Sequence, residues 1–331
     1  MNLNKLISVA KNREHNKQFL KLMLQLKGEE QRELFNIATS IRNNAQGNGV
    51  NLRGVIEFSN RCSKNCNYCA MRRDNCLERY TLSEDEIMLA TERVINSGIN
   101  TVFLQSGEFS ENNDLIERII KQIYQSFKCD IILCAGNKER DLLKKYKELG
   151  CYGYILKYET INPDIYESAT GKIYSERLSC IQDIKKSGLK LGTGNIVGLP
   201  NQTIDDIVDD VIKSFELLPD FISVSPFVPS SGTPYENIPK GNIDITLNLM
   251  AIWRIAFPQI WIPTVSALEL LRSGGQVEGL KAGANVITIN FTPSKKREQY
   301  FIYDKKRFVV NLDHAKKTAY EAKMTLNMDM K

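Results

Sequence analysis

The chain has 331 residues, 42% of them hydrophobic, so it can form one large α/β barrel or two ordinary domains around a substantial core. Its net charge of +5 comes from short basic patches without interleaved aromatic residues, which argues against a groove for nucleic acid. The sequence shows no secretory signal and no membrane-spanning apolar run, and its eight cysteines are scattered. We therefore expect a cytoplasmic protein in a reducing compartment, without nucleic-acid or membrane partners.

The N-terminal segment, residues 1–50, is predicted to be a helical cap. Apolar residues gather on one side between residues 19 and 26, and a second helical pattern covers residues 30–43. Gly47-Asn48-Gly49 ends this pattern, because closely spaced glycines interrupt helices.

From residue 52 onward, β-rich runs alternate with helical patterns. The runs cover 53–58, 100–105, 130–134, 153–158, 189–197, 220–224, 260–265 and 284–290. Helices are predicted at about 83–98, 113–127, 139–149, 175–187, 203–217, 244–257 and 274–282, the first opening with a capping box from Ser83 to Glu86. This pattern predicts a (β/α)8 barrel over residues 51–310, followed by a helical tail over residues 311–331. A doubly wound open sheet is the alternative.

Three cysteines follow the first predicted strand within eight residues. Cys62, Cys66 and Cys69 are separated by three and two residues, so a short loop can place three thiolates around one iron–sulfur cluster. Three ligands leave one iron open, as a reactive metal site requires. A zinc knuckle is the alternative, but no further Cys or His follows at a finger-like spacing. The loop therefore predicts a 4Fe–4S cluster.

Polar and small residues follow several other predicted strands, where such a barrel builds its active site. The second strand leads into the turn Gln105-Ser106-Gly107-Glu108, which by itself also fits a plain surface turn. Lys157 and Glu159 are two residues apart at the end of the fourth run, so in a regular strand both side chains would enter the barrel. There they would bind ligands or form an ion pair with each other. Further residues at strand ends are Ile196, Val197, Thr264 and Ser266.

The Cys-x3-Cys-x2-Cys loop, with Tyr68 before the last cysteine, resembles the cluster loop of radical S-adenosylmethionine (SAM) enzymes. In that family the open iron binds SAM, and the reduced cluster cleaves it to a 5′-deoxyadenosyl radical. The resemblance implies that Ser106, Gly107 and Glu108 hold the methionine amino group. The other implied SAM contacts are Tyr68, Glu159 at the ribose, Arg177 at the carboxylate, and Ile196 and Val197 at the adenine. Lys157, Thr264 and Ser266 would then face the substrate.

Within that family, residues from about 34 to about 303 most resemble the maturases of iron–iron hydrogenases. The segments that carry this similarity are 57–60, 71–75, 105–108, 159–163, 197–206 and 283–286. The resemblance implies a small substrate, a cysteine-bound iron carbonyl–cyanide precursor, with a reductant such as flavodoxin or ferredoxin and other hydrogenase maturation proteins as partners.

The chain departs from the maturases at three places. Lys157 stands where they usually have Arg, and Ser266-Ala267-Leu268-Glu269 replaces a Thr-Ala-Met-Gly-like sequence. The last cysteine is Cys180, so the C-terminal cysteines of many maturases are missing and we expect one cluster. A maturase paralogue, a radical enzyme like biotin synthase or methylornithine synthase, and a non-catalytic iron–sulfur or zinc scaffold therefore remain alternatives.

Overall fold

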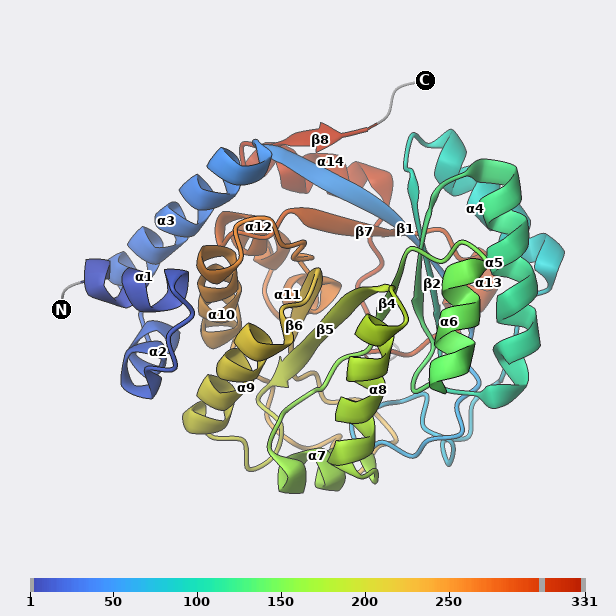
Figure 1. Ribbon diagram of the computed structural model, residues 1–331, viewed down its shortest axis with the longest axis horizontal. Coiled ribbons are helices and arrows are strands. Elements are labelled where there is room, and N and C mark those ends of the chain that lie inside the picture. The colour runs from blue at the N-terminus through green and yellow to red at the C-terminus, as the bar shows by residue number, and fades with distance from the viewer. Residues whose placement is uncertain (1–2, 304–306, 329–331) are drawn as a thin grey trace.

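The computed structural model describes residues 3–303 and 307–328. Three short ranges lie outside the described residues: 1–2, 304–306 and 329–331. They belong to the predicted N-terminal cap, barrel and C-terminal tail, respectively. Figure 1 shows strands at the centre of the molecule with helices around them, and the N-terminal helices at one side.

The N-terminal residues form three helices, as the sequence predicts: α1 (Leu3–Lys11), α2 (Lys17–Leu24) and α3 (Gly28–Gln46). These helices pack on the outside of the barrel, α2 against α9 (Ile204–Leu217) and α3 against α10 (Ile243–Ala256). Arg42 of α3 is 1% exposed and donates hydrogen bonds of 2.6 and 2.9 Å to the carbonyls of Leu280 and Ala284. Because buried carbonyls need a donor, this arginine joins the N-terminal helices to the barrel.

The central sheet curls through seven parallel strands of the described chain in the order β6-β5-β4-β3-β2-β1-β7. Their bounds are β1 (Gly49–Ser59), β2 (Thr101–Ser106), β3 (Asp130–Cys134), β4 (Gly153–Ile155), β5 (Lys190–Val197), β6 (Phe221–Pro226) and β7 (Val286–Asn290). A short strand, β8 (Thr325–Asn327), pairs with the start of β1.

The strand predicted over residues 260–265 does not form as a regular strand. Trp261 makes a single bridge to Phe221 of β6, and Pro263 makes one to Val286 of β7. Pro263 has no N–H and cannot extend a hydrogen-bonded ladder, which explains the irregularity. The segment still fills the gap between the two edge strands, so the ring has eight positions. The predicted α/β barrel is therefore confirmed, with one irregular member.

The predicted helices between strands form with shifts of one or two residues at most ends. Besides α9 and α10 they are α4 (Glu84–Asn96), α5 (Asn113–Phe127), α6 (Arg140–Glu148), α8 (Tyr174–Lys186) and α12 (Gly275–Lys281). Elements that the sequence analysis did not assign are η1 (Ser110–Asn112), α7 (Pro163–Thr170), α11 (Ser266–Leu271) and α13 (Ser294–Arg297), while α14 (Leu312–Glu321) lies in the predicted helical tail.

The capping box that opens α4 is present. Glu86 N donates to Ser83 Oγ at 3.2 Å, and Ser83 N donates to the Glu86 carboxylate at 2.9 Å. Such a cap stabilises a helix by about 1 kcal/mol. None of the helices in the described part of the chain has the length and apolarity needed to cross a bilayer.

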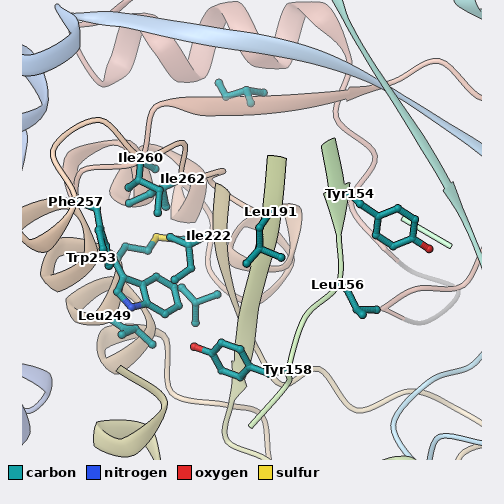
Figure 2. Close-up of a cluster of buried hydrophobic side chains, with 14 of the residues drawn as sticks. Tyr154, Leu156, Tyr158, Leu191, Ile222, Leu249, Trp253, Phe257, Ile260 and Ile262 are labelled. Carbon is teal, nitrogen blue, oxygen red and sulfur yellow. The ribbon is translucent and has the colours of Figure 1, made fainter. Parts of the chain in front are cut away.

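The main core lies between the sheet and the helices, and Figure 2 shows Leu191 of β5 and Ile222 of β6 directed to the same packed region as Trp253 of α10. Because neighbouring strand residues point to opposite faces, the alternate residues enter the barrel. A smaller apolar cluster inside the barrel contains Val55, Phe103, Ile132, Ile155 and Phe221. Each such side chain contributes about 1.5–3 kcal/mol when fully buried. The polar groups inside the barrel therefore lie beside this apolar cluster.

Candidate active site

A cavity of about 350 Å³ occupies the inside of the barrel. It gathers all but one of the predicted site residues, namely Cys62, Cys66, Tyr68, Cys69, Ser106, Gly107, Glu108, Lys157, Glu159, Arg177, Ile196, Thr264 and Ser266. Val197 is the exception. It follows Ile196 in β5, so its side chain points to the opposite face and lies in the outer core, 1% exposed.

The three loop cysteines are free thiols on the wall of this cavity. Burial raises the pKa of Cys66 to about 11, and burial also raises the pKa of Cys69 above its usual value. These two thiols therefore stay protonated at neutral pH in the metal-free chain. They become thiolate ligands when a bound metal replaces the proton.

The cysteine loop is attached to two neighbouring elements through its backbone. Ser63 N donates to Glu108 O at 2.8 Å, next to the end of β2, and Asn67 N donates to Ala169 O of α7 at 2.7 Å. Gly107 allows the first of these contacts, because a Cβ at this position would collide with the loop at Cys62. The predicted SAM-binding turn and the cysteine loop therefore touch directly.

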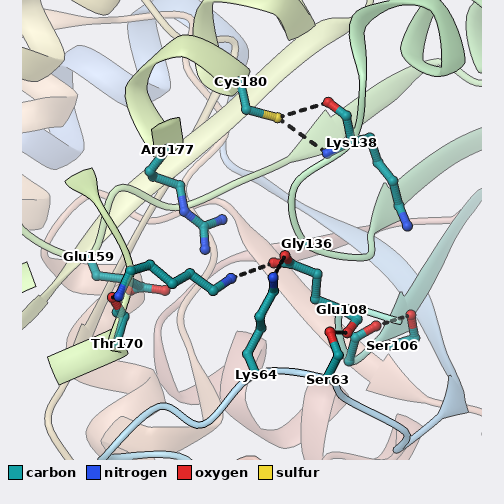
Figure 3. Close-up of polar contacts among 12 residues, drawn as sticks. Ser63, Lys64, Ser106, Glu108, Gly136, Lys138, Glu159, Thr170, Arg177 and Cys180 are labelled. Carbon is teal, nitrogen blue, oxygen red and sulfur yellow. Dashed lines mark hydrogen bonds and ion pairs between the residues drawn. The ribbon is translucent and has the colours of Figure 1, made fainter. Parts of the chain in front are cut away.

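Glu108 lies between two lysines (Figure 3). Lys64 extends from the cysteine loop to 3.2 Å from Oε1, and Lys172 lies 2.7 Å from Oε2. Burial opposes ionisation of Glu108, but Lys172, Arg177 and the backbone of Asn137 together outweigh it, and the net effect is a pKa below the usual value. The carboxylate is thus charged, and a ligand ammonium group would share it with these lysines.

Lys157 and Glu159 meet inside the barrel, although not on a regular strand. β4 ends at Ile155, which makes the predicted strand over 153–158 too long. Glu159 has a φ of +62° and is held by backbone bonds to β5, where its N–H reaches Gly194 O at 3.1 Å. Lys157 Nζ lies 3.0 Å from Glu159 Oε2. This oxygen makes no hydrogen bond with hydrogen-bond geometry to any described residue.

Arg177 approaches the cavity from α8 and is 8% exposed. Its Nε donates a 2.8 Å hydrogen bond to the hydroxyl of Tyr166 of α7, which fixes the direction of the guanidinium. Tyr68 OH donates to Glu159 Oε1 at 3.4 Å. Arg177 and Tyr68 therefore both present polar groups to the cavity.

Thr264 and Ser266 come from the irregular eighth position of the ring. Thr264 is 1% exposed, and its hydroxyl donates a hydrogen bond to Gln276 O at 2.9 Å. This hydroxyl therefore already has a hydrogen-bond partner within the protein. Ser266 is the first residue of α11 and is partly exposed to the cavity.

The structure adds three charged residues that the sequence analysis missed. Lys172 follows α7 and pairs with Glu108, while Arg53 of β1 donates to Thr288 Oγ1 at 2.7 Å. Arg307 binds the carboxylate of Glu57 through both terminal nitrogens, one of them at 2.6 Å. Arg307 and Glu57 are 250 positions apart, so no local pattern signals their pairing.

Three free thiols on a barrel cavity that also carries charged pairs are suited to bind an iron–sulfur cluster within an α/β barrel. The Radical SAM superfamily profile matches residues 56–212. Over 285 residues the chain is 39% identical to the [FeFe] hydrogenase maturase subunit HydE of Thermotoga maritima, covering 85% of this chain and 82% of that one.

A second relative is the 3-methylornithine synthase of Methanosarcina acetivorans, 29% identical over 86% of this chain and 82% of that one. Among solved structures, a methylornithine synthase superposes with a TM-score of 0.86 at 22% identity, over 98% of both chains. The chain belongs to the radical SAM superfamily and is an enzyme of that class.

The residues present fit the 4Fe–4S cluster and the SAM that the family implies. Cys62, Cys66 and Cys69 supply three soft ligands on one cavity wall, all free of disulfides. The Oε2 of Glu159 is paired with Lys157 but accepts no hydrogen bond from the described residues, so it offers an acceptor for a hydroxyl.

Proposed function

We propose that this enzyme acts in the maturation of the di-iron site of FeFe hydrogenases. The observation that carries the proposal is the convergence of Cys62, Cys66 and Cys69 with Lys157 and Glu159 on one barrel cavity, in a chain 39% identical to HydE. The alternative among radical SAM enzymes is a paralogous reaction on a related small substrate.

The site residues divide by the group they would hold. The three cysteines would hold the cluster, and the cluster, reduced by a donor such as flavodoxin or ferredoxin, would supply the electron that cleaves SAM to methionine and a 5′-deoxyadenosyl radical. Glu108 accepts hydrogen bonds from the amino group of SAM, and Glu159 accepts them from the ribose hydroxyls. Arg177 donates hydrogen bonds to the carboxylate of SAM. Tyr68, Ser106, Gly107 and Ile196 complete this side of the cavity. Val197 has no part in it.

The substrate side of the cavity favours a small anionic molecule. Lys157 and Arg53 both line the cavity. Arg53 is 8% exposed, and its guanidinium lies 4.6 Å from the centroid of the Phe103 ring. Cations in such apolar surroundings need a partner of opposite charge. Thr264 and Ser266 border the same space and would contact the substrate with polar groups.

Sulfur insertion of the biotin synthase type is the second candidate reaction, and the cavity argues against it. That chemistry uses a sacrificial second cluster, whereas Cys134 is the only cysteine outside the loop among the described cavity residues. Anaerobically reconstituted protein should hold about four irons and four sulfides per chain. A reproducible excess of about two irons per chain would favour the second-cluster reaction.

A reconstituted maturation reaction tests the proposal. Purified hydrogenase that lacks its di-iron site is incubated with the other maturation proteins, and this chain replaces the HydE component. Hydrogen evolution above a Cys66→Ala control is the expected result. No hydrogen evolution from a preparation that does cleave SAM would overturn the hydrogenase assignment and leave the paralogous reaction.

A further inference from the structure

Arg79 lies ten residues after Cys69, and its side chain sits within the curve of the cysteine loop. It is half-buried and donates hydrogen bonds only to backbone carbonyls. Nη1 donates to Asn60 O at 2.9 Å and Met71 O at 2.8 Å, and Nη2 donates to Arg72 O at 2.6 Å, Arg73 O at 3.3 Å and Asn75 O at 3.2 Å.

These five carbonyls lie on both sides of the cluster ligands. Asn60 stands two residues before Cys62, and the other four follow Cys69 within six residues. One planar guanidinium therefore ties the entrance of the loop to its exit. A forked donor is suited to this task because its nitrogens are fixed relative to one another, whereas a lysine offers one nitrogen.

Other bonds hold the middle of the loop. Ser63 and Asn67 attach it to β2 and α7, and Arg73 N donates to Lys64 O at 2.7 Å. Asn60 also joins the two ends, because its Nδ2 donates to Glu78 O at 2.8 Å and its Oδ1 accepts from Tyr80 N at 2.7 Å. Arg79 extends this connection from Asn60 to the carbonyls of residues 71–75, which lie nearer to Cys69. Without Arg79 the five carbonyls would lose this donor, and of these the Arg72 carbonyl would keep its bond from Asn75 N.

We propose that Arg79 is a positioning residue that holds the cysteine loop in its ligating conformation before the cluster is inserted. Arg79 is not among the residues that line the cavity, and it acts through the backbone on the spacing of the three thiols. The inference rests on the proposed cluster but not on the hydrogenase assignment. Loss of Arg79 should therefore weaken cluster retention while the barrel remains folded.

The test compares Arg79→Met with Arg73→Met in the full-length protein. Arg73 is the matched control, because it stands in the same loop, 62% exposed, and pairs only with the neighbouring Asp74. Each protein is reconstituted anaerobically, and iron release to an excess of chelator is followed by absorbance. In parallel, hydrogen exchange of residues 60–76 is measured in the cluster-free proteins.

Arg79→Met should release iron roughly 10- to 100-fold faster than wild type, as expected for the loss of a residue that orients metal ligands. Its loop amides should exchange faster while the amides of β1 and β2 keep their protection. Arg73→Met should match wild type in both measurements. Arg79→Lys should fall between, because an ammonium group satisfies some of the carbonyls but cannot span both ends.

Iron release and loop exchange at wild-type rates in Arg79→Met would overturn the proposal. If Arg79→Met does not fold, Arg79→Lys decides in its place, and wild-type behaviour of that variant would overturn the proposal. If wild-type protein assembles no cluster, the proposed function fails. The exchange comparison then still reports whether Arg79 orders the loop.

Discussion

Lys157 and Glu159 form an ion pair inside the barrel, with Lys157 Nζ 3.0 Å from Glu159 Oε2. Both side chains are mostly buried, at 21% and 15% exposure. The pair exists although β4 ends at Ile155, because Glu159 turns into the left-handed region and is fixed by its backbone bonds to β5. We propose that ligands separate this pair, with SAM binding Glu159 and the substrate binding Lys157.

Glu159→Gln should weaken SAM binding. The amide keeps the shape of the side chain but loses the charge that strengthens its hydrogen bonds, which is worth about 1–3 kcal/mol. Isothermal titration of the reconstituted protein with SAM measures the change. Unaltered affinity would show that the ribose does not reach this carboxylate.

Lys157→Met should act on the substrate and spare SAM. The stem of the side chain remains, so the cavity should keep its shape and SAM affinity should stay close to that of the wild type. Turnover of the native substrate should fall. Lys157→Arg should shift preference toward the usual maturase substrate, because a guanidinium binds planar anions in a forked geometry. If Lys157→Met abolishes SAM binding or unfolds the barrel, the pair is a structural bridge.

The two lysines at Glu108 should contribute unequally to stability. Lys172 is 11% exposed and Lys64 38% exposed. Lys172→Met should lower the free energy of unfolding by about 1–3 kcal/mol, because it leaves a buried carboxylate without its nearer partner. Lys64→Met should cost less than about 1 kcal/mol, as for a solvent-screened pair. Urea denaturation of the cluster-free proteins compares them, and equal losses would show that burial does not control these pairs.

Most of the barrel could be predicted from the sequence, because alternating β-rich and helical runs recur with clear ends. The cysteine loop could be predicted as well, since its three cysteines lie within eight residues. The irregular segment at Trp261 and Pro263 was predicted as a strand because its composition is apolar. Its geometry depends on the bridges to β6 and β7, which bring together distant parts of the chain.

The partners of the charged residues could not be predicted. Lys172 reaches Glu108 across 64 positions, and Arg307 reaches Glu57 across 250. Neither pair follows a strand or helix period, so only the folded chain reveals them. The position of Val197 has a different cause, because the alternation of side chains along β5 places it on the face opposite Ile196.

Asp210 should make stability depend on pH. It is fully buried in α9 and accepts hydrogen bonds from Ile161 N at 2.7 Å and Asn195 Nδ2 at 2.9 Å. Burial raises its pKa from 3.8 to about 8, so between these values the folded protein holds a proton that the unfolded chain releases. The contribution of Asp210 to stability is therefore present below about pH 4 and is lost as pH rises toward about 8.

Asp210→Asn removes this titration and keeps the shape of the side chain. Asn195 Oδ1 makes no hydrogen bond in the described chain, so its amide can turn to accept from the new amide. The variant should gain stability relative to wild type as pH rises from about 5 to about 8, measured by urea denaturation. A difference that stays constant over this range would show that Asp210 is ionised throughout.

Cleavage of SAM tests the central claim most directly. The wild-type chain, reconstituted anaerobically to about four irons, is reduced with dithionite in the presence of SAM, and 5′-deoxyadenosine is quantified by chromatography. Cys66→Ala, treated identically, is the control. We predict 5′-deoxyadenosine from the wild type and only background from Cys66→Ala. A cluster-loaded wild type that forms no more 5′-deoxyadenosine than Cys66→Ala would contradict the account and leave a metal-carrying scaffold.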